Sequence, residues 1–338
     1  MIEIDGSMGE GGGQIVRTAL SLSLTTQRSI RLTNIRTNRS RPGLRPQHVA
    51  AVQAAATIGE AAVSEVQEGT RTLTFEPSTV VPGTYRFDVG TAGSAILVLQ
   101  TALLPLLTAP RSSRVTVTGG THNRFAPPFD FFAATFLPIV ERMGPTLRAT
   151  LDRPGFYPKG GGRCTVDVQP VGELEPLTLT ERGASRPFRI RAIVANLPRH
   201  IAEREIATLQ EALSVEIGET RIDTPSSLSA GNALLLEVPF QHVTEVISGI
   251  GEKGLPAEQV AMGVAEAAES YLDAEVPVGP HLADQLLLPL ALGGGQFRTT
   301  ALTTHTQTNA AVIERFLGNC FSVVDATDGW SISASPHS

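Results

Sequence analysis

Apolar positions follow two patterns along the chain, one typical of helices and one typical of strands. Apolar segments next to glycine-rich loops predict helices within residues 9–24, 89–107 and 281–295, and further helices are expected within 47–62 and 126–144. Alternating or β-branched runs predict strands at 29–35, 70–75, 85–89, 114–118 and 164–168. Because the similar segments lie roughly 80–200 residues apart, the pattern predicts repeated α/β units rather than a short-period solenoid.

The central part of the chain has a different character. It predicts strands at 187–195 and 233–240 and amphipathic helices at 201–213 and 260–272, a set that can pack by itself. Glycine-rich segments of the first kind resume at Gly279. We therefore expect a smaller domain over 184–276, inserted into a large domain made of residues 1–183 and 277–338.

Composition narrows the class of protein. Hydrophobic residues make up 41% of the 338 residues, which is enough to build a core, and the net charge of −6 argues against a protein that coats a nucleic-acid duplex. Two cysteines, Cys164 and Cys320, are too few for a disulfide framework. Neither a leader peptide nor a segment apolar enough for a bilayer is evident, so we expect a cytoplasmic protein without a membrane partner.

The first candidate site is the glycine-rich run 9–14. Consecutive glycines let backbone N–H groups approach an anion, although the spacing fits neither a dinucleotide fingerprint nor a P-loop. On the glycines alone, an anion site and a tight turn before a helix are equally good interpretations. Two side chains favour the anion site: Glu10 can hold a divalent metal against a phosphate, and Arg17 is expected about two turns into the following helix.

Positive charge is concentrated in the same region. Between Gly11 and Gly59 the chain has no Asp, Glu or Lys. It has seven arginines there: Arg17, Arg28, Arg31, Arg36, Arg39, Arg41 and Arg45. A solvated surface is the usual interpretation of such a run, but arginine is the residue preferred for bidentate contact with phosphate. Seven arginines in an acidic protein therefore favour an anion-binding site.

Histidine chemistry is a third possibility. None of the seven histidines has the spacing of a zinc site. His305 lies in the polar run 304–309, just before the apolar segment 310–317, where a nucleophile or base can be exposed at the edge of a helix. A lone histidine more often has a structural role than a catalytic one. Two further glycine-bearing segments remain open: 119–130 lines a cleft or caps a helix, and 153–162 is either a rigid turn with an anion-binding glycine run or a hairpin connection.

Taken together, these motifs resemble the RNA 3′-terminal phosphate cyclase family. The matching segments occur in the family's order: 5–23, 41–48, 89–101, 119–131, 155–162, 198–209, 281–292 and 305–317. The resemblance implies that ATP transfers AMP to a histidine, that AMP then moves to an RNA 3′-phosphate, and that the ribose 2′-OH expels AMP to leave a 2′,3′-cyclic phosphodiester. It also implies a large domain of three repeated units, each a four-stranded sheet with two helices, and an inserted thioredoxin-like domain.

The resemblance also assigns residues. His305 matches the histidine that accepts AMP, and Glu10 matches a glutamate linked to Mg²⁺ or Mn²⁺. The ATP- and phosphate-binding positions fall on Arg17, Arg36, Arg39, Gln47, Gln100, His281, Asp284 and Gln285. At position 281 this chain has a histidine, whereas some family members have a tyrosine that stacks on adenine. Two alternatives remain: an inactive relative that binds RNA or ribosome precursors, and an enolpyruvyl-transferase-like enzyme. Neither needs a nucleophilic histidine, and the oligomeric state is not predicted.

Overall fold

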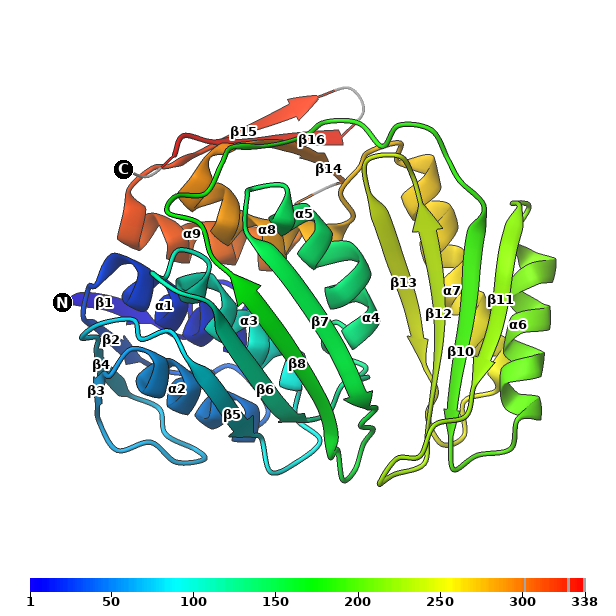
Figure 1. Cartoon of the computed structure of the whole chain (residues 1–338), viewed down its shortest axis with the longest axis horizontal. Helices are drawn as coiled ribbons and strands as arrows, with labels where there is room; N and C mark the ends of the chain where they lie inside the picture. The colour runs from blue at the N-terminus through cyan, green and yellow to red at the C-terminus, as the bar shows by residue number, and fades with distance from the viewer. Residues whose placement is uncertain (301, 327–328, 337–338) are drawn as a thin grey trace.

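Four mixed four-stranded sheets and eight helices make up the part of the chain that the computed structural model describes, residues 1–300, 302–326 and 329–336 (Figure 1). The count takes α4 (Phe129–Phe131), the π-helix Phe132–Phe136 and α5 (Leu137–Glu141) as one continuous helix. The predicted α/β class is confirmed. None of the helices in the described ranges is both long and apolar enough to cross a membrane.

The first unit follows a β-α-β-α-β-β order. Its elements are β1 (Ile2–Asp5), α1 (Gly13–Thr26), β2 (Ile30–Thr33), α2 (Pro46–Ile58), β3 (Ala62–Val63) and β4 (Leu73–Glu76). The strand order in the sheet is β1-β2-β4-β3, with β1 and β2 parallel and the other pairs antiparallel. Each parallel pair is therefore joined by a crossover helix, as parallel strands require.

Two further units repeat this topology. The second has β5 (Thr84–Asp88), α3 (Ala95–Leu106), β6 (Ser113–Gly119), the α4–α5 helix, β7 (Thr146–Arg153) and β8 (Gly162–Gln169). The third has β9 (Leu177–Leu179), α8 (Pro280–Gly293), β14 (Gly295–Thr299), α9 (Thr304–Leu317), β15 (Phe321–Ala326) and β16 (Gly329–Ala334). Their strand orders, β5-β6-β8-β7 and β9-β14-β16-β15, correspond to that of the first unit.

The fourth sheet interrupts the third unit between β9 and α8. It contains β10 (Phe188–Ala195), β11 (Ile217–Asp223), β12 (Gly231–Pro239) and β13 (Thr244–Ile250), with α6 (His200–Ala212) and α7 (Ala257–Asp273). The strand order is β11-β10-β12-β13, and only β10 and β11 are parallel. Helices α6 and α7 contact each other and cover one face of this sheet (Figure 1).

The helices of the three repeated units pack against one another inside a surround of sheets. Contacts join α1 to α2, α3 and α9, join α2 to α3, and join α8 to α9. A helix that is covered on all sides needs apolar residues all round. This explains why α3 is almost wholly apolar and why α1 has buried residues on every face, with Leu20, Leu22 and Leu99 inaccessible to solvent.

Most predicted elements are confirmed, and two details were wrong. In the segment 281–295 the helix comes first, and its glycines follow it; Gly294 and Gly295 adopt φ of 76° and 113°, a region that suits glycine at a helix end. Arg17 lies about one turn into α1 rather than two, because the helix begins at Gly13, only four residues before it. Several edge strands, among them β7, β11 and β13, were not predicted.

Candidate active site

A cleft of about 1110 Å³ opens between the repeated units and the fourth sheet. The ten residues predicted as site residues all line it: Glu10, Arg17, Arg36, Arg39, Gln47, Gln100, His281, Asp284, Gln285 and His305. The N-terminal turns of six helices, α1, α2, α3, α4, α8 and α9, reach the same cleft. The site is therefore assembled from crossover connections of all three repeated units.

His305 lies in the first turn of α9, after the N-cap residue Thr303, whose hydroxyl accepts a hydrogen bond from a backbone N–H. Its Nε2 is 2.7 Å from Oε2 of Glu10. The other carboxylate oxygen, Oε1, lies 2.6 Å from Nη2 of Arg39. The backbone N–H of Glu10 donates to the Thr308 hydroxyl at 3.2 Å, so α9 and the glycine-rich loop are tied together at this point.

Gln14 supports the histidine from the other side, and sequence reasoning missed it. Its Oε1 is 2.9 Å from Nδ1 of His305, and its Nε2 donates to Oδ1 of Asp284. Because an amide oxygen only accepts hydrogen bonds, Nδ1 carries a proton in this arrangement, and Nε2 is the ring nitrogen that faces the cleft. The available signal in the sequence was an amide side chain directly after the glycine run and three residues before Arg17.

Asp284 closes this chain of contacts. Burial raises the pKa of its carboxyl group, and the charges of His305 and Arg17 and the hydrogen bond from Gln14 oppose that shift. The side-chain amide of Asn309 donates to the Asp284 carbonyl at 2.8 Å and accepts from the Thr18 hydroxyl at 2.7 Å. Helices α1, α8 and α9 are thus held in register around the imidazole.

Four of the seven predicted anion-site arginines line the cleft: Arg17, Arg36, Arg39 and Arg45. The other three do not. Arg28 donates to the Phe316 carbonyl at 2.6 Å, Arg31 pairs loosely with Glu3 at 3.9 Å, and Arg41 is exposed. The structure therefore brings together the arginines of the loop and the helix starts and leaves the other three away from the cleft; anion binding stays a prediction.

The cleft arginines shape their surroundings electrostatically. Burial lowers the pKa of Arg17 to about 10, against an opposing effect of Asp284, so this guanidinium still carries its charge at neutral pH. Burial, together with Arg17, Arg36 and Arg45, lowers the pKa of His48 well below its usual value. His48 is therefore neutral, and its Nδ1 accepts the backbone N–H of Arg45 at 3.0 Å at the start of α2.

Three amide side chains line the middle of the cleft. Oε1 of Gln47 accepts the backbone N–H of Ser94 at 2.8 Å, at the start of α3. Gln100 donates to Gln285, which in turn donates to the carbonyl of His281 at 3.0 Å. Desolvation in the cleft and the nearby His305 lower the pKa of His281.

Metal binding can be tested against the residues present. In the described ranges, no cluster of three His, Cys, Asp or Glu side chains has the form of a metal site. Glu10 offers one partly exposed carboxylate to the cleft. Mg²⁺ is commonly held by one or two carboxylates, with phosphates and water completing its shell. The residues therefore fit a cation that arrives with phosphate, and not one held by protein ligands alone.

Of the two remaining glycine-bearing segments, one lines the cleft and the other does not. Residues 123–128 line the cleft, whereas 153–162 forms the hairpin connection between β7 and β8 and packs on the fourth sheet. In the first segment, His122 lies beside Asp130 at 2.9 Å, and Asp130 accepts from Arg191 of β10 at 2.5 Å. In the second, the N–H of Lys159 donates to the Ser229 hydroxyl at 3.1 Å. Both segments join the second unit to the fourth sheet.

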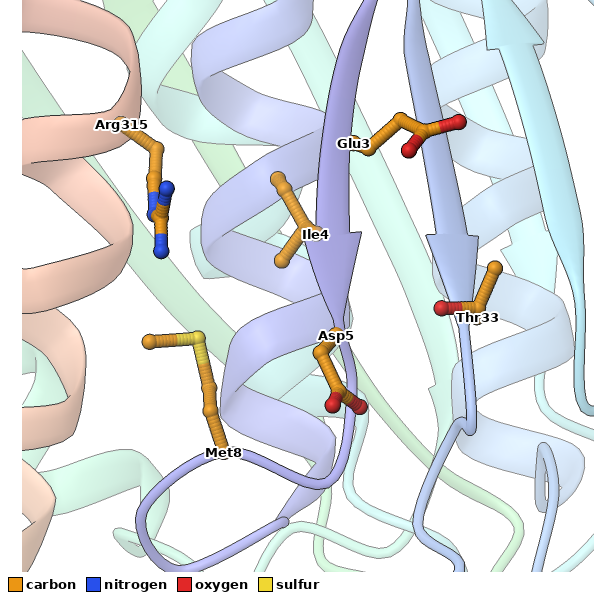
Figure 2. A pocket seen from close by; sticks show the side chains of 6 residues that line it. All are labelled: Glu3, Ile4, Asp5, Met8, Thr33 and Arg315. Carbon is orange, nitrogen blue, oxygen red and sulfur yellow. The ribbon is translucent and has the colours of Figure 1, made fainter.

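A second and smaller pocket, of about 390 Å³, lies between β1 and α9. Figure 2 shows the side chains that line it: Glu3, Ile4, Asp5, Met8, Thr33 and Arg315. Asp5 accepts the N–H and the hydroxyl of Ser7 at 2.9 and 2.7 Å, and so shapes the turn that leads to Glu10. The pocket contains none of the residues predicted for the site.

A histidine held with Nε2 toward the cleft, a carboxylate and four arginines, at the meeting point of six helix N-termini, define an enzyme that acts on phosphate groups. Comparison with known proteins agrees. The family model for RNA 3′-terminal phosphate cyclase matches residues 8–323. The chain therefore belongs to the RNA 3′-terminal phosphate cyclase family and is an enzyme of that family.

Three relatives illustrate the similarity, and each is named RNA 3′-terminal phosphate cyclase. The protein of Koribacter versatilis is 51% identical over 325 residues, which cover 96% of this chain and 92% of the relative. That of Ralstonia nicotianae is 49% identical over 318 residues, covering 94% and 91%. That of Salmonella enteritidis PT4 is 44% identical over 336 residues and covers 99% of both chains.

Proposed function

We propose that this chain uses ATP to convert the 3′-terminal phosphate of RNA into a 2′,3′-cyclic phosphodiester, with His305 as the residue that carries AMP. One observation supports this role above the others. Gln14 accepts from Nδ1, which leaves Nε2 directed into a cleft lined by Arg17, Arg36 and Arg39. Imidazole is a good nucleophile only through an unprotonated nitrogen. Because Gln14 holds the proton on Nδ1, Nε2 is the nitrogen that attacks once it has given up its own proton.

In the first step, the lone pair on Nε2 attacks the α-phosphorus of ATP. An N–P bond forms, the bond from the α-phosphorus to the bridging oxygen breaks, and pyrophosphate leaves with the electron pair. The ring keeps its Nδ1 proton, and Gln14 and Asp284 stabilise the positive charge that develops on it. In this structure Nε2 lies 2.7 Å from the Glu10 carboxylate, which only accepts hydrogen bonds, so Nε2 also carries a proton. We propose that Glu10 takes this proton, passes it to solvent and turns away, which leaves the lone pair on Nε2 free to attack.

We propose that Glu10 turns toward a divalent cation on the triphosphate, Mg²⁺ or Mn²⁺, which would neutralise part of the phosphate charge. Arg39 is bonded to Glu10 in this state, so the same movement frees its guanidinium to bind a phosphate. The cleft thus exchanges internal ion pairs for contacts with its substrates.

We propose two further phosphoryl-transfer steps at the same cleft. An oxygen of the RNA 3′-phosphate attacks the phosphorus of the bound AMP, the N–P bond breaks and His305 is regenerated, which gives an RNA(3′)pp(5′)A end. The neighbouring ribose 2′-OH then attacks the RNA phosphorus, loses its proton, and AMP departs. This last step needs mainly positioning, because the nucleophile is already adjacent to the activated phosphate.

We also propose the division of the chain into a large domain, residues 1–183 and 277–338, and an inserted thioredoxin-like domain, residues 184–276. The strand order β11-β10-β12-β13, with one parallel pair and both helices on one face, supports this arrangement. A cytoplasmic location is likewise proposed. Cys164 and Cys320 are both free, which supports a reducing compartment.

The two alternative functions are less well supported. An inactive relative would not need the nucleophile, yet His305, Glu10 and Arg39 form one continuous chain of contacts. An enolpyruvyl transferase would use the anion site without a covalent intermediate. Transfer of label from ATP to the protein is expected for the proposed function and for neither alternative.

The test is incubation with α-labelled ATP and Mg²⁺ or Mn²⁺, followed by recovery of the protein. We expect label on the wild type, stable to base and labile to acid as a phosphoramidate is, and none on His305→Ala. His200→Ala, a change at an exposed histidine at the start of α6, is the matched control and should be labelled like the wild type. Label on His305→Ala at the wild-type level would overturn the assignment.

A further inference from the structure

The rim of the cleft carries an aromatic side chain that the steps above do not use. Phe125 lies in the loop between β6 and α4 and is 90% exposed, yet it lines the same cleft as His305. The loop is fixed at both ends: the N–H of Thr121 donates to the Gly155 carbonyl at 2.9 Å, and that of Phe129 donates to the Thr121 carbonyl at 2.9 Å. The ring is therefore held out at the rim by an anchored loop.

This loop begins beside the phosphate-binding part of the cleft. Gln47 accepts the N–H of Ser94 at 2.8 Å, and Ser94 forms a backbone bridge with Gly120, where the loop starts. If an extended molecule binds with its end at the arginines and His305, the rest of the molecule leaves the cleft along this rim.

The rim also carries an arginine side chain, Arg124, that can change its ion-pair partner. The guanidinium carbon of Arg124 lies 5.2 Å from the centroid of the Phe125 ring, and Nη1 donates to both carboxylate oxygens of Glu252 at 3.0 and 2.9 Å. Glu252 follows β13, so the ion pair connects the second unit to the fourth sheet. Both side chains are well exposed, at 60% and 43%, and such surface pairs contribute little and exchange readily.

We propose that Phe125 and Arg124 form a binding platform for the single-stranded RNA that precedes the terminal phosphate. A base stacks on the ring of Phe125, and Arg124 leaves Glu252 to bind a backbone phosphate. Aromatic stacking combined with a nearby cation is the usual way in which proteins hold single strands. A chain of net charge −6 needs such local contacts, because it repels a polyanion at longer range.

The inference rests on the proposed function, because it takes RNA as the substrate. The competing occupant of the ring is the adenine of ATP. RNA is favoured because it offers a base and a further phosphate in alternation, which matches the adjacent aromatic and cationic groups.

The test measures binding of a single-stranded RNA that ends in a 3′-phosphate, by fluorescence anisotropy. Phe125→Ala should weaken binding by roughly 5- to 150-fold, the range expected for loss of one stacked base, and Phe125→Trp should restore it. Tyr157→Ala is the matched control, because Tyr157 is an aromatic residue that is 81% exposed but does not line the cleft. RNA binding to Phe125→Ala equal to that of the wild type would overturn the platform.

The role of Arg124 is tested with a variant that should strengthen RNA binding and one that should weaken it. Glu252→Gln frees Arg124 and should tighten RNA binding by roughly 1.5- to 5-fold, whereas Arg124→Ala should weaken it and make the log–log salt slope shallower by about 0.7. No change in either variant would contradict the proposed exchange.

Adenylation of the enzyme by ATP alone distinguishes the two occupants and the two proposals. Phe125→Ala should keep the wild-type ATP dependence of this RNA-independent step. A higher ATP requirement with unchanged RNA binding would assign the ring to adenine and overturn the inference. If the wild type forms no AMP adduct, the proposed function fails, and the RNA-binding comparison still decides the platform.

Discussion

Replacement of Gln14 by leucine tests whether the imidazole is held for attack through Nε2. The side chains have similar volumes, but leucine makes neither the contact with Nδ1 of His305 nor the hydrogen bond to Asp284. When AMP joins Nε2, the ring becomes positively charged, and the bond to Gln14 becomes charge-assisted. Hydrogen bonds to charged groups contribute about 1.5–3 kcal/mol, so the rate of adenylation should fall roughly 10- to 150-fold.

The assay is single-turnover formation of the protein–AMP adduct at varied ATP concentrations. The maximal rate should fall while the ATP concentration for half-maximal rate stays nearly constant, because Gln14 acts on the histidine rather than on the nucleotide. Loss of its hydrogen bond also raises the pKa of Asp284 further, since that bond opposes the effect of burial. Gln14→Asn, which retains the amide on a shorter stem, should recover part of the rate.

Stability has to be separated from catalysis. Ser23→Ala is the control, because it removes a hydrogen bond of 2.7 Å from a buried position on the same helix, to the Arg28 carbonyl, outside the cleft. It should lose a comparable amount of stability and keep the adenylation rate. Adduct formation by folded Gln14→Leu at the wild-type rate would refute the positioning role, and a changed ATP requirement with an unchanged maximal rate would reassign Gln14 to nucleotide binding.

Three further predictions concern the metal, the RNA end and pH. Glu10→Ala should slow adenylation, with only partial recovery at higher Mg²⁺ or Mn²⁺; an unchanged rate and metal dependence would make Glu10 structural. Arg39→Ala should weaken RNAs with a 3′-phosphate more than the same RNAs with a 3′-hydroxyl, and equal losses in anisotropy would contradict this. Burial raises the pKa of Glu205 from 4.5 to about 7, so the folded state loses stability as pH rises through that window; in urea unfolding, Glu205→Gln should be more stable by up to about 3 kcal/mol at pH 8 and equal near pH 4. A difference independent of pH would refute it.

The helices could be predicted from the sequence because burial leaves a direct mark on composition. Helix α3 lies between other helices, so its apolar run is nearly continuous, whereas α6 and α7 cover a sheet and have one apolar and one polar face. Edge strands leave no such mark. Strand β11 has mostly exposed or half-exposed side chains and pairs only with β10, so its stability comes from backbone hydrogen bonds that side-chain periodicity does not record.

The site was predicted unevenly for a related reason. Charge and glycine content pointed to the region that lines the cleft, but which four of the seven arginines reach the cleft depends on local direction. Arg31 lies in β2 and points to solvent, whereas Arg36, three residues after the strand, has a positive φ of 53° and donates to the carbonyls of Arg41 and Gly43. A one-residue shift in such a loop would exchange inner for outer positions, and the pattern of charges alone does not fix it. The roles of the site residues came from the family resemblance.

The repeat explains how an acidic chain can hold two polyanions at once. In each unit, a parallel strand pair sends its crossover connections to the same edge, so the three units bring six helix N-termini to one cleft. Each N-terminus carries the positive end of a helix dipole, which favours anions without adding a formal charge. The net charge of −6 is therefore no measure of the potential inside the cleft. The histidine can lie among the cleft arginines on the first turn of α9 because Gln14, which is itself bonded to Asp284, holds its far nitrogen.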